Sequence, residues 1–259
     1  MKKRKIIGIA VTCLLSALAL ICGGIFLHQY RDAQSSAAAF DHLAGLVAEV
    51  TPPAPDVSDA EGEEPSASAA ELAQEKYGAL FEQNNDFVGW ISIDGTGIHY
   101  PVMQTPDNPD YYLKHGFDKA YSNYGVPYID EACAPGLSNN IVIYGHHMND
   151  GSMFADLCQY EDRGFYEGHK TIHFDTLSSF GEYEVVAAFR FNANKDSFKY
   201  NEYINMDEAE FAEFLENIRA RALYDTGAEA EYGDTLLTLS TCEYTYKNGR
   251  FVVVAKKVN

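Results

Sequence analysis

The run Thr235-Leu-Leu-Thr-Leu-Ser-Thr-Cys242, followed after seven residues by Arg250-Phe-Val-Val-Val254, decides the fold class of this chain. Alternation along the first run places Ser240 and Cys242 on the same face of a strand. If the two runs form an antiparallel hairpin closed symmetrically about the connection, Cys242 lies directly opposite Arg250, with their Cβ atoms about 4.5–5.5 Å apart. The hairpin predicts a β-rich fold and brings a thiol beside a guanidinium.

Six further runs of β-branched and aromatic residues, each bounded by Gly, Asn, Asp or Pro, precede the hairpin. Together with the hairpin they predict short strands over residues 87–93, 97–103, 126–129, 140–145, 170–174, 183–191, 235–241 and 250–258. We expect a mainly β fold in which these eight strands form a closed barrel, because closure removes exposed strand edges.

Two helices are expected in the same part of the chain. One covers residues 70–83, before the first strand, with inward-facing side chains at Leu72, Tyr77, Leu80 and Phe81. The other covers residues 207–223 and is inserted before the cysteine strand. It is opened by the capping pattern Asp207-x-x-Glu210 and carries one apolar stripe, formed by Phe211, Phe214, Leu215, Ile218 and Ala222.

The N-terminus predicts a membrane anchor. Residues 6–27 are 22 consecutive uncharged positions, which as a helix would span roughly 33 Å, enough to cross a bilayer. Residues 1–5 carry four basic side chains, which keep that end in the cytoplasm and place the rest of the chain outside the cell membrane. The alternative is a cleaved signal peptide, whose apolar region usually has only about 7–15 residues.

The segment after the apolar run predicts a spacer. Residues 40–47 have apolar positions at helical spacing, and residues 51–68 are rich in proline and acidic side chains. We therefore expect a basic cytoplasmic tail over 1–5, a transmembrane signal anchor over 6–27, an extracytoplasmic stalk over 28–69 and a folded domain over 70–259.

Composition excludes two broad classes of protein. The chain has 38 acidic and 19 basic residues, for a net charge of −19, so it repels phosphate backbones and does not bind nucleic acid. Its 46% of hydrophobic residues is enough for a core, which excludes wholesale disorder. Beyond the apolar run lie Cys133, Cys158 and Cys242, an odd number that leaves at least one thiol without an intrachain disulfide.

A cysteine nucleophile needs a general base within reach. His146 directly follows the expected strand over residues 140–145, and Cys242 also ends a strand. The two side chains reach the same rim of the barrel if their strands run parallel. His146 and His147 could instead hold a metal, but no cysteine or carboxylate lies at ligand spacing around them, so we expect no metal.

Three motifs resemble those of the class B sortases. They are Tyr144-Gly-His-His-Met148 with Gly151-Ser-Met-Phe154, Thr238-Leu-Ser-Thr-Cys-Glu243, and Arg250-Phe-Val-Val-Val-Ala-Lys256. The resemblance covers roughly residues 75–259, and the helix over 207–223 resembles the insertion that separates class B from class A sortases.

The resemblance implies a role for each matched position. His146 would be the general acid and base, Cys242 the nucleophile, and Arg250 the group that positions the substrate and stabilises the oxyanion. The backbone N–H of Glu243 would be a second oxyanion donor, and Ser240 would contact the substrate. One position departs from the family pattern, because Tyr244 stands where some members have an acid.

The reaction implied is a transpeptidation that needs no cofactor. Cys242 would attack a threonine carbonyl in the C-terminal sorting signal of an exported protein, giving a thioacyl-enzyme. An amine of a peptidoglycan precursor or a pilin subunit would then accept the acyl group at the outer face of the membrane.

Two alternatives remain open at this point. The first is another cell-wall cysteine enzyme. Papain-like peptidases usually place Cys before His, however, and the arginine of the L,D-transpeptidase pattern lies closer to its cysteine than Arg250 does to Cys242. The second alternative is a non-catalytic, membrane-tethered binding module.

Overall fold

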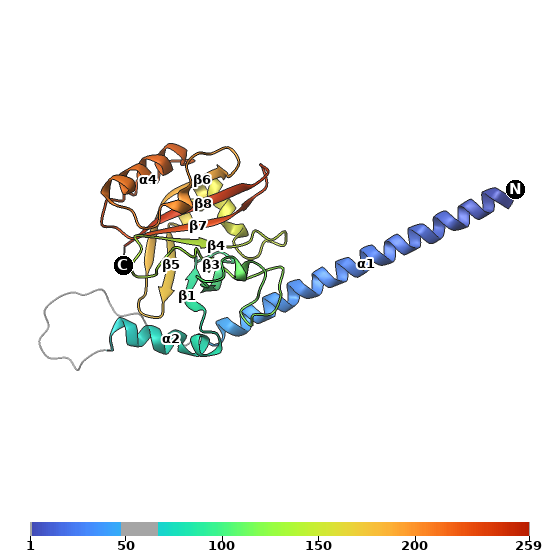
Figure 1. Ribbon diagram of the computed structural model, residues 1–259, viewed down its shortest axis with the longest axis horizontal. Coiled ribbons are helices and arrows are strands. Elements are labelled where there is room, and N and C mark those ends of the chain that lie inside the picture. Colours follow the sequence, from blue (N-terminus) through green and yellow to red (C-terminus); the bar gives the residue numbers. More distant parts are fainter. Residues whose placement is uncertain (1, 48–66, 259) are drawn as a thin grey trace, which may run out of the picture. The chain divides into compact units, whose positions relative to one another are not determined.

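Eight strands close into a barrel in the order β1-β2-β3-β4-β7-β8-β6-β5 (Figure 1). The computed structural model describes residues 2–47 and 67–258. The strands are β1 Phe87–Ser92, β2 His99–Met103, β3 Tyr128–Ile129, β4 Asn140–Tyr144, β5 Thr171–Thr176, β6 Glu182–Asn192, β7 Leu236–Glu243 and β8 Gly249–Lys257. Each overlaps a strand predicted from the sequence, so the closed barrel is confirmed.

The pairing of β4 with β7 determines which residues lie together at one rim of the barrel. These two strands are parallel, in a register that runs from Asn140 opposite Leu236 to Tyr144 opposite Ser240. Strand β8 then returns antiparallel to β7. Because β4 and β7 point the same way, the residues that follow them emerge at one rim of the barrel.

Both faces of β7 are covered, which is why seven of its eight residues are buried. One face carries apolar side chains such as Leu237 and Leu239, each fully buried. Burial of such a side chain contributes about 1.5–3 kcal/mol to folding. The other face lies under the connection between β6 and β7, where the hydroxyls of Tyr200 and Ser240 form a buried 2.7 Å hydrogen bond.

Helix α4 (Glu208–Arg221) lies in the β6–β7 connection, as expected. It begins with the predicted capping box, in which Asp207 and Glu210 satisfy each other's backbone N–H groups. Four members of its apolar stripe are buried, namely Phe211, Phe214, Leu215 and Ile218. Ala222, predicted as the fifth, is the partly exposed C-cap, because the helix ends at Arg221. Just beyond it, Leu223 N–H donates to Ala188 O of β6 over 2.9 Å. Figure 1 shows α4 lying beside β6 and β8.

Helix α2 (Ala69–Gln83) begins at a capping box formed by Ser68 and Glu71. Its buried stripe runs through Ala73, Tyr77 and Leu80. The prediction that Phe81 faces inward is wrong: this ring is 37% exposed, because the stripe leaves position 81 at its edge.

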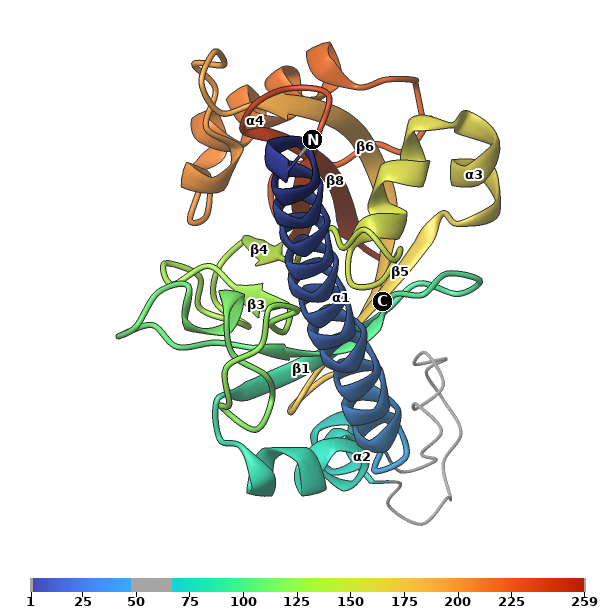
Figure 2. The ribbon, with the colours of Figure 1, turned by 90° about the vertical axis from the view of Figure 1, so that its right-hand side faces the viewer.

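Several short helices were not expected from the sequence. They are the 3-10 turns η1 (Tyr111–Leu113), η2 (Ala155–Glu161) and η3 (Tyr200–Glu202), and the helix α3 (Arg163–Gly168). Elements of three to seven residues are too short to show a hydrophobic period. In Figure 2, α3 lies to the right of β6 and α4 to its left.

The chain divides into two units, residues 1–41 and 42–259. Helix α1 (Lys2–Ala44) is continuous over 43 residues, and Thr12–Ala44 is long and apolar enough to cross a membrane. The helix expected around residues 40–47 is therefore not separate. It continues α1, because residues 28–44 contain no glycine or proline and are rich in alanine. The expected stalk is thus helical at its start, and its proline-rich residues 51–66 lie outside the described residues.

Candidate active site

The ends of β4 and β7 are joined by hydrogen bonds beyond the strand ladder itself. Gly145 N–H donates to Ser240 O over 3.1 Å, and Thr241 Oγ1 donates to Gly145 O over 2.8 Å. The close approach at Gly145 needs glycine, because a Cβ there would lie 2.5 Å from the buried ring of Phe154. His146 therefore enters the site at the same rim as Cys242.

Cys242 of β7 lies directly opposite Arg250 of β8, as the hairpin predicted. Both side chains are only partly exposed, and Arg250 Nη1 donates to Gly249 O over 2.9 Å. This bond uses one of five guanidinium N–H groups, so the remaining donors can serve an anionic oxygen near the thiol.

His146 is held by a backbone carbonyl from another part of the chain. Its Nε2–H donates to Leu113 O over 2.8 Å, at the end of η1. Burial lowers the pKa of His146, the Leu113 carbonyl raises it, and the cationic Lys114 lowers it further. The net lowering favours a neutral imidazole near pH 7. Within residues 67–258, this ring bonds to Leu113 rather than to Cys242.

Residues 91–258 match the family model for the sortase domain. The chain is 35% identical to sortase B of Listeria monocytogenes over 182 residues, which are 69% of this chain and 72% of that protein. It is 34% identical to sortase B of Staphylococcus aureus over 192 residues, 72% of this chain and 76% of that protein. The chain belongs to the class B sortases.

Solved structures of class B sortases share the barrel. Sortase B of Bacillus anthracis superposes with a TM-score of 0.72 at 27% identity, covering 89% of this chain and 99% of that one. A substrate complex of Staphylococcus aureus sortase B gives a TM-score of 0.66 at 31% identity, covering 72% and 86%. Sortases are cysteine transpeptidases, so the family accounts for a thiol at the rim.

The two residues expected to bind substrate lie on opposite faces of β7 in this sortase. Ser240 shares the face of Cys242, but it is only 1% exposed and its hydroxyl is bonded to Tyr200. The side chain of Glu243 lies on the other face, where Oε1 accepts from Thr245 N–H over 2.9 Å and lies 3.8 Å from Arg190 Nε. Their roles toward substrate therefore stay predictions.

Sequence reasoning missed Tyr128 and Tyr200, which lie near Arg250, and Tyr144, whose ring contacts that of Tyr128. The hydroxyl of Tyr200 bonds to Ser240, that of Tyr128 donates to Asp110 Oδ1 over 2.6 Å, and that of Tyr144 donates to Asp130 Oδ2 over 2.7 Å. Burial raises the pKa of both Tyr128 and Tyr200, and the nearby charge of Arg250 opposes the rise. Strand alternation could have placed Tyr144 on the face of Ser240, but nothing in the sequence marks Tyr200.

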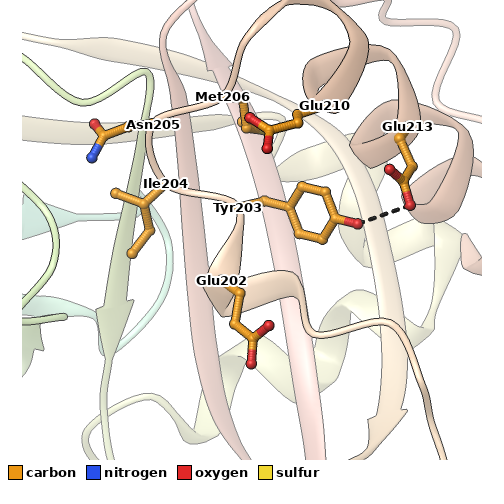
Figure 3. A pocket seen from close by; sticks show the side chains of 7 residues that line it. All are labelled: Glu202, Tyr203, Ile204, Asn205, Met206, Glu210 and Glu213. Carbon is orange, nitrogen blue, oxygen red and sulfur yellow. Dashed lines mark hydrogen bonds between the residues drawn. The ribbon is translucent and has the colours of Figure 1, made fainter.

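The catalytic candidates line neither of two pockets of this sortase. One pocket, of about 270 Å³, lies between η3 and α4, where Tyr203 OH donates to Glu213 over 3.0 Å (Figure 3). The other, of about 590 Å³, lies at the opposite rim, near Thr235 and Lys257. Among the described residues, no three His, Cys, Asp or Glu side chains gather in a way that could hold a metal.

Proposed function

We propose that this class B sortase is a membrane-anchored transpeptidase that uses Cys242, His146 and Arg250 to cleave C-terminal sorting signals of exported proteins. One observation carries the proposal: the parallel β4–β7 pair and the antiparallel β7–β8 pair deliver these three residues to one rim. The family model for the sortase domain matches residues 91–258, which include all three residues.

In the first step, the Cys242 thiol gives its proton to His146 and its sulfur attacks a threonine carbonyl of the sorting signal. A C–S bond forms, and the oxyanion is stabilised by the guanidinium of Arg250 and the backbone N–H of Glu243. The peptide C–N bond then breaks, the His146 imidazolium protonates the departing amine, and a thioacyl-enzyme remains.

In the second step, an amine of a peptidoglycan precursor or of a pilin subunit attacks the thioester. His146 takes a proton from this amine, a new amide bond forms, and the Cys242 thiolate leaves and regains a proton. Structures described as a sortase B–substrate complex and as sortase B complexed with triglycine support two binding events in the family.

The anchor brings the site to the face of the membrane where both substrates are presented. Residues 1–5 would lie in the cytoplasm, 6–27 would span the membrane, 28–69 would form the stalk, and 70–259 the catalytic domain outside. The length and apolar character of Thr12–Ala44 support a membrane span, and the proposed orientation rests on the basic residues before it.

The test uses the full chain in detergent micelles and a peptide library with a central threonine and varied neighbours. We expect cleavage after the threonine and a thioacyl adduct on the Cys242 peptide, detected by mass spectrometry. Cys242→Ala should lower cleavage at least about 1,000-fold, because the nucleophile is lost. Cys133→Ala is the matched control, since this thiol donates to Asn140 O at the start of β4, away from Cys242.

Cleavage by Cys242→Ala at the wild-type rate would show that the nucleophile is misassigned. Binding of library peptides with neither cleavage nor adduct would favour the membrane-tethered binding module instead.

A further inference from the structure

The residues on both sides of His146 are bonded to the end of β7. On one side, Gly145 is bonded to Ser240 and Thr241. On the other side, His147 is bonded to Cys242 and Tyr244. His146 itself stands between these two anchored positions, with its own ring directed to Leu113 O.

The first bond of His147 reaches the backbone of the candidate nucleophile. His147 Nδ1 lies 3.1 Å from Cys242 O, and a carbonyl only accepts, so Nδ1 carries the hydrogen. Cys158 Sγ lies 3.4 Å from the same nitrogen, and burial raises the pKa of this thiol to about 12. Cys158 therefore stays protonated and brings no charge to the ring.

In the second bond, His147 is the acceptor rather than the donor. Tyr244 OH donates to His147 O over 2.9 Å, and the two rings meet edge to face with centroids 5.1 Å apart. The tyrosine is 66% exposed, so it covers the two strand ends from the solvent side. This bond joins residue 244 to the carbonyl of the residue directly after His146.

We propose that His147 and Tyr244 form a clamp that positions the His146 imidazole against the Cys242 thiol. This inference rests on the function proposed above and adds two positioning residues to it. A slip of one residue between the strand ends would move His146 by about 3.3 Å. A misplacement of about 1 Å is enough to cost a catalytic step as much as 100-fold.

The clamp gives Tyr244 a physical role at the position where related chains have an acid. A tyrosine hydroxyl cannot act on His146 as a carboxylate would. It donates to a backbone carbonyl and orients the histidine through the main chain.

The test compares variants that keep or remove each bond. His147→Asn keeps an N–H near the position of Nδ1, whereas His147→Gln places its amide near that of Nε2 and leaves Cys242 O without this donor. Tyr244→Phe keeps the ring and removes the hydroxyl, with Tyr246→Phe in the same connection as its control. Melting temperatures of all variants show whether each protein is folded.

Two measurements are made on the full chain in detergent micelles. The first is the rate of iodoacetamide labelling of Cys242 as a function of pH, resolved from the other cysteines by peptide mapping. The second is kcat and KM with a cleaved library peptide. The labelling does not depend on turnover, so it tests the clamp even if the peptide reaction fails.

We expect His147→Gln and Tyr244→Phe to shift the pH–labelling profile of Cys242 toward that of His146→Ala and to lower kcat about tenfold with little change in KM. His147→Asn should recover most of the loss, and Tyr246→Phe should match the wild type. The clamp is refuted if His147→Gln and Tyr244→Phe keep the wild-type profile while His146→Ala alters it. It is also refuted if His146→Ala itself has no effect, and that result would count against the proposed function as well.

Discussion

Where β7 passes into β8, the two faces of the hairpin differ in how far their polar side chains are buried. On one face, Cys242 and Arg250 lie opposite each other and are partly exposed. On the other face, Thr241 is bonded to Gly145 O, and the carboxylate of Glu243 is bonded to Thr245 and lies near Arg190.

Under the proposed function, the reacting thiol and its supporting contacts lie on opposite faces of three consecutive residues. Because side chains alternate along a strand, Thr241 and Glu243 lie on one face and Cys242, between them, lies on the other. Substitutions on one face should therefore change the rate, and those on the other should change stability.

The largest difference in kcat/KM is expected between substitutions of Arg250 and of Arg190. Arg250→Lys should lower kcat/KM about 100-fold, because a lysine cannot reproduce the fork of donors toward an oxyanion. Arg190→Lys should keep kcat/KM within a few-fold of wild type and lower the melting temperature, because Arg190 also pairs with Glu161 at 2.5 Å. Peptide kinetics and thermal melting of both variants test this pair.

A rate loss for Arg190→Lys as large as that for Arg250→Lys would show that the two faces are not separate. Equal melting temperatures of the wild type and Arg190→Lys would show that Arg190 does not stabilise the fold.

A smaller effect is expected at Thr241. Thr241→Val keeps the shape of the side chain and removes its hydrogen bond to Gly145 O, so the free energy of unfolding should fall by about 1 kcal/mol. Thr241→Ser keeps the hydroxyl and serves as the control. Urea denaturation measures both, and a Thr241→Val protein as stable as the wild type would contradict the anchoring of Gly145.

The smallest effect concerns His146, the proposed acid and base. The positive charge of Lys114 disfavours the imidazolium of His146, so Lys114→Gln should raise the pKa of His146, whereas Lys114→Arg should leave it unchanged. Titration of the histidine ring signals by NMR measures the midpoint. A lower midpoint in Lys114→Gln would show that this charge does not act on the ring.

The fold and the central pair of the site could be predicted because both follow from local pattern. Strands such as β7 show alternation within eight residues, and the symmetric connection after Cys242 is enough to place Arg250 opposite it. The sequence left open whether the strands that precede His146 and end at Cys242 run parallel. The structure shows that these strands, β4 and β7, pair in parallel.

The surroundings of the pair could not be predicted, because they depend on contacts between distant segments. Tyr200 meets Ser240 across 40 residues, and His147 meets Cys242 across 95. Neither contact produces a hydrophobic period or a residue spacing that could be recognised in the sequence. The apolar run marks only residues 6–27 of helix α1, whereas helix-forming residues continue the helix to Ala44.

The carbonyl that accepts from His146 belongs to the main chain at Leu113. Since that oxygen can only accept, the neutral ring keeps its hydrogen on Nε2, and Nδ1 is left as its basic nitrogen. Every amino acid supplies the same carbonyl, so an alanine scan would pass over this contact. The choice of tautomer is thus encoded in the path of the backbone through η1, 33 positions upstream of the ring that it controls.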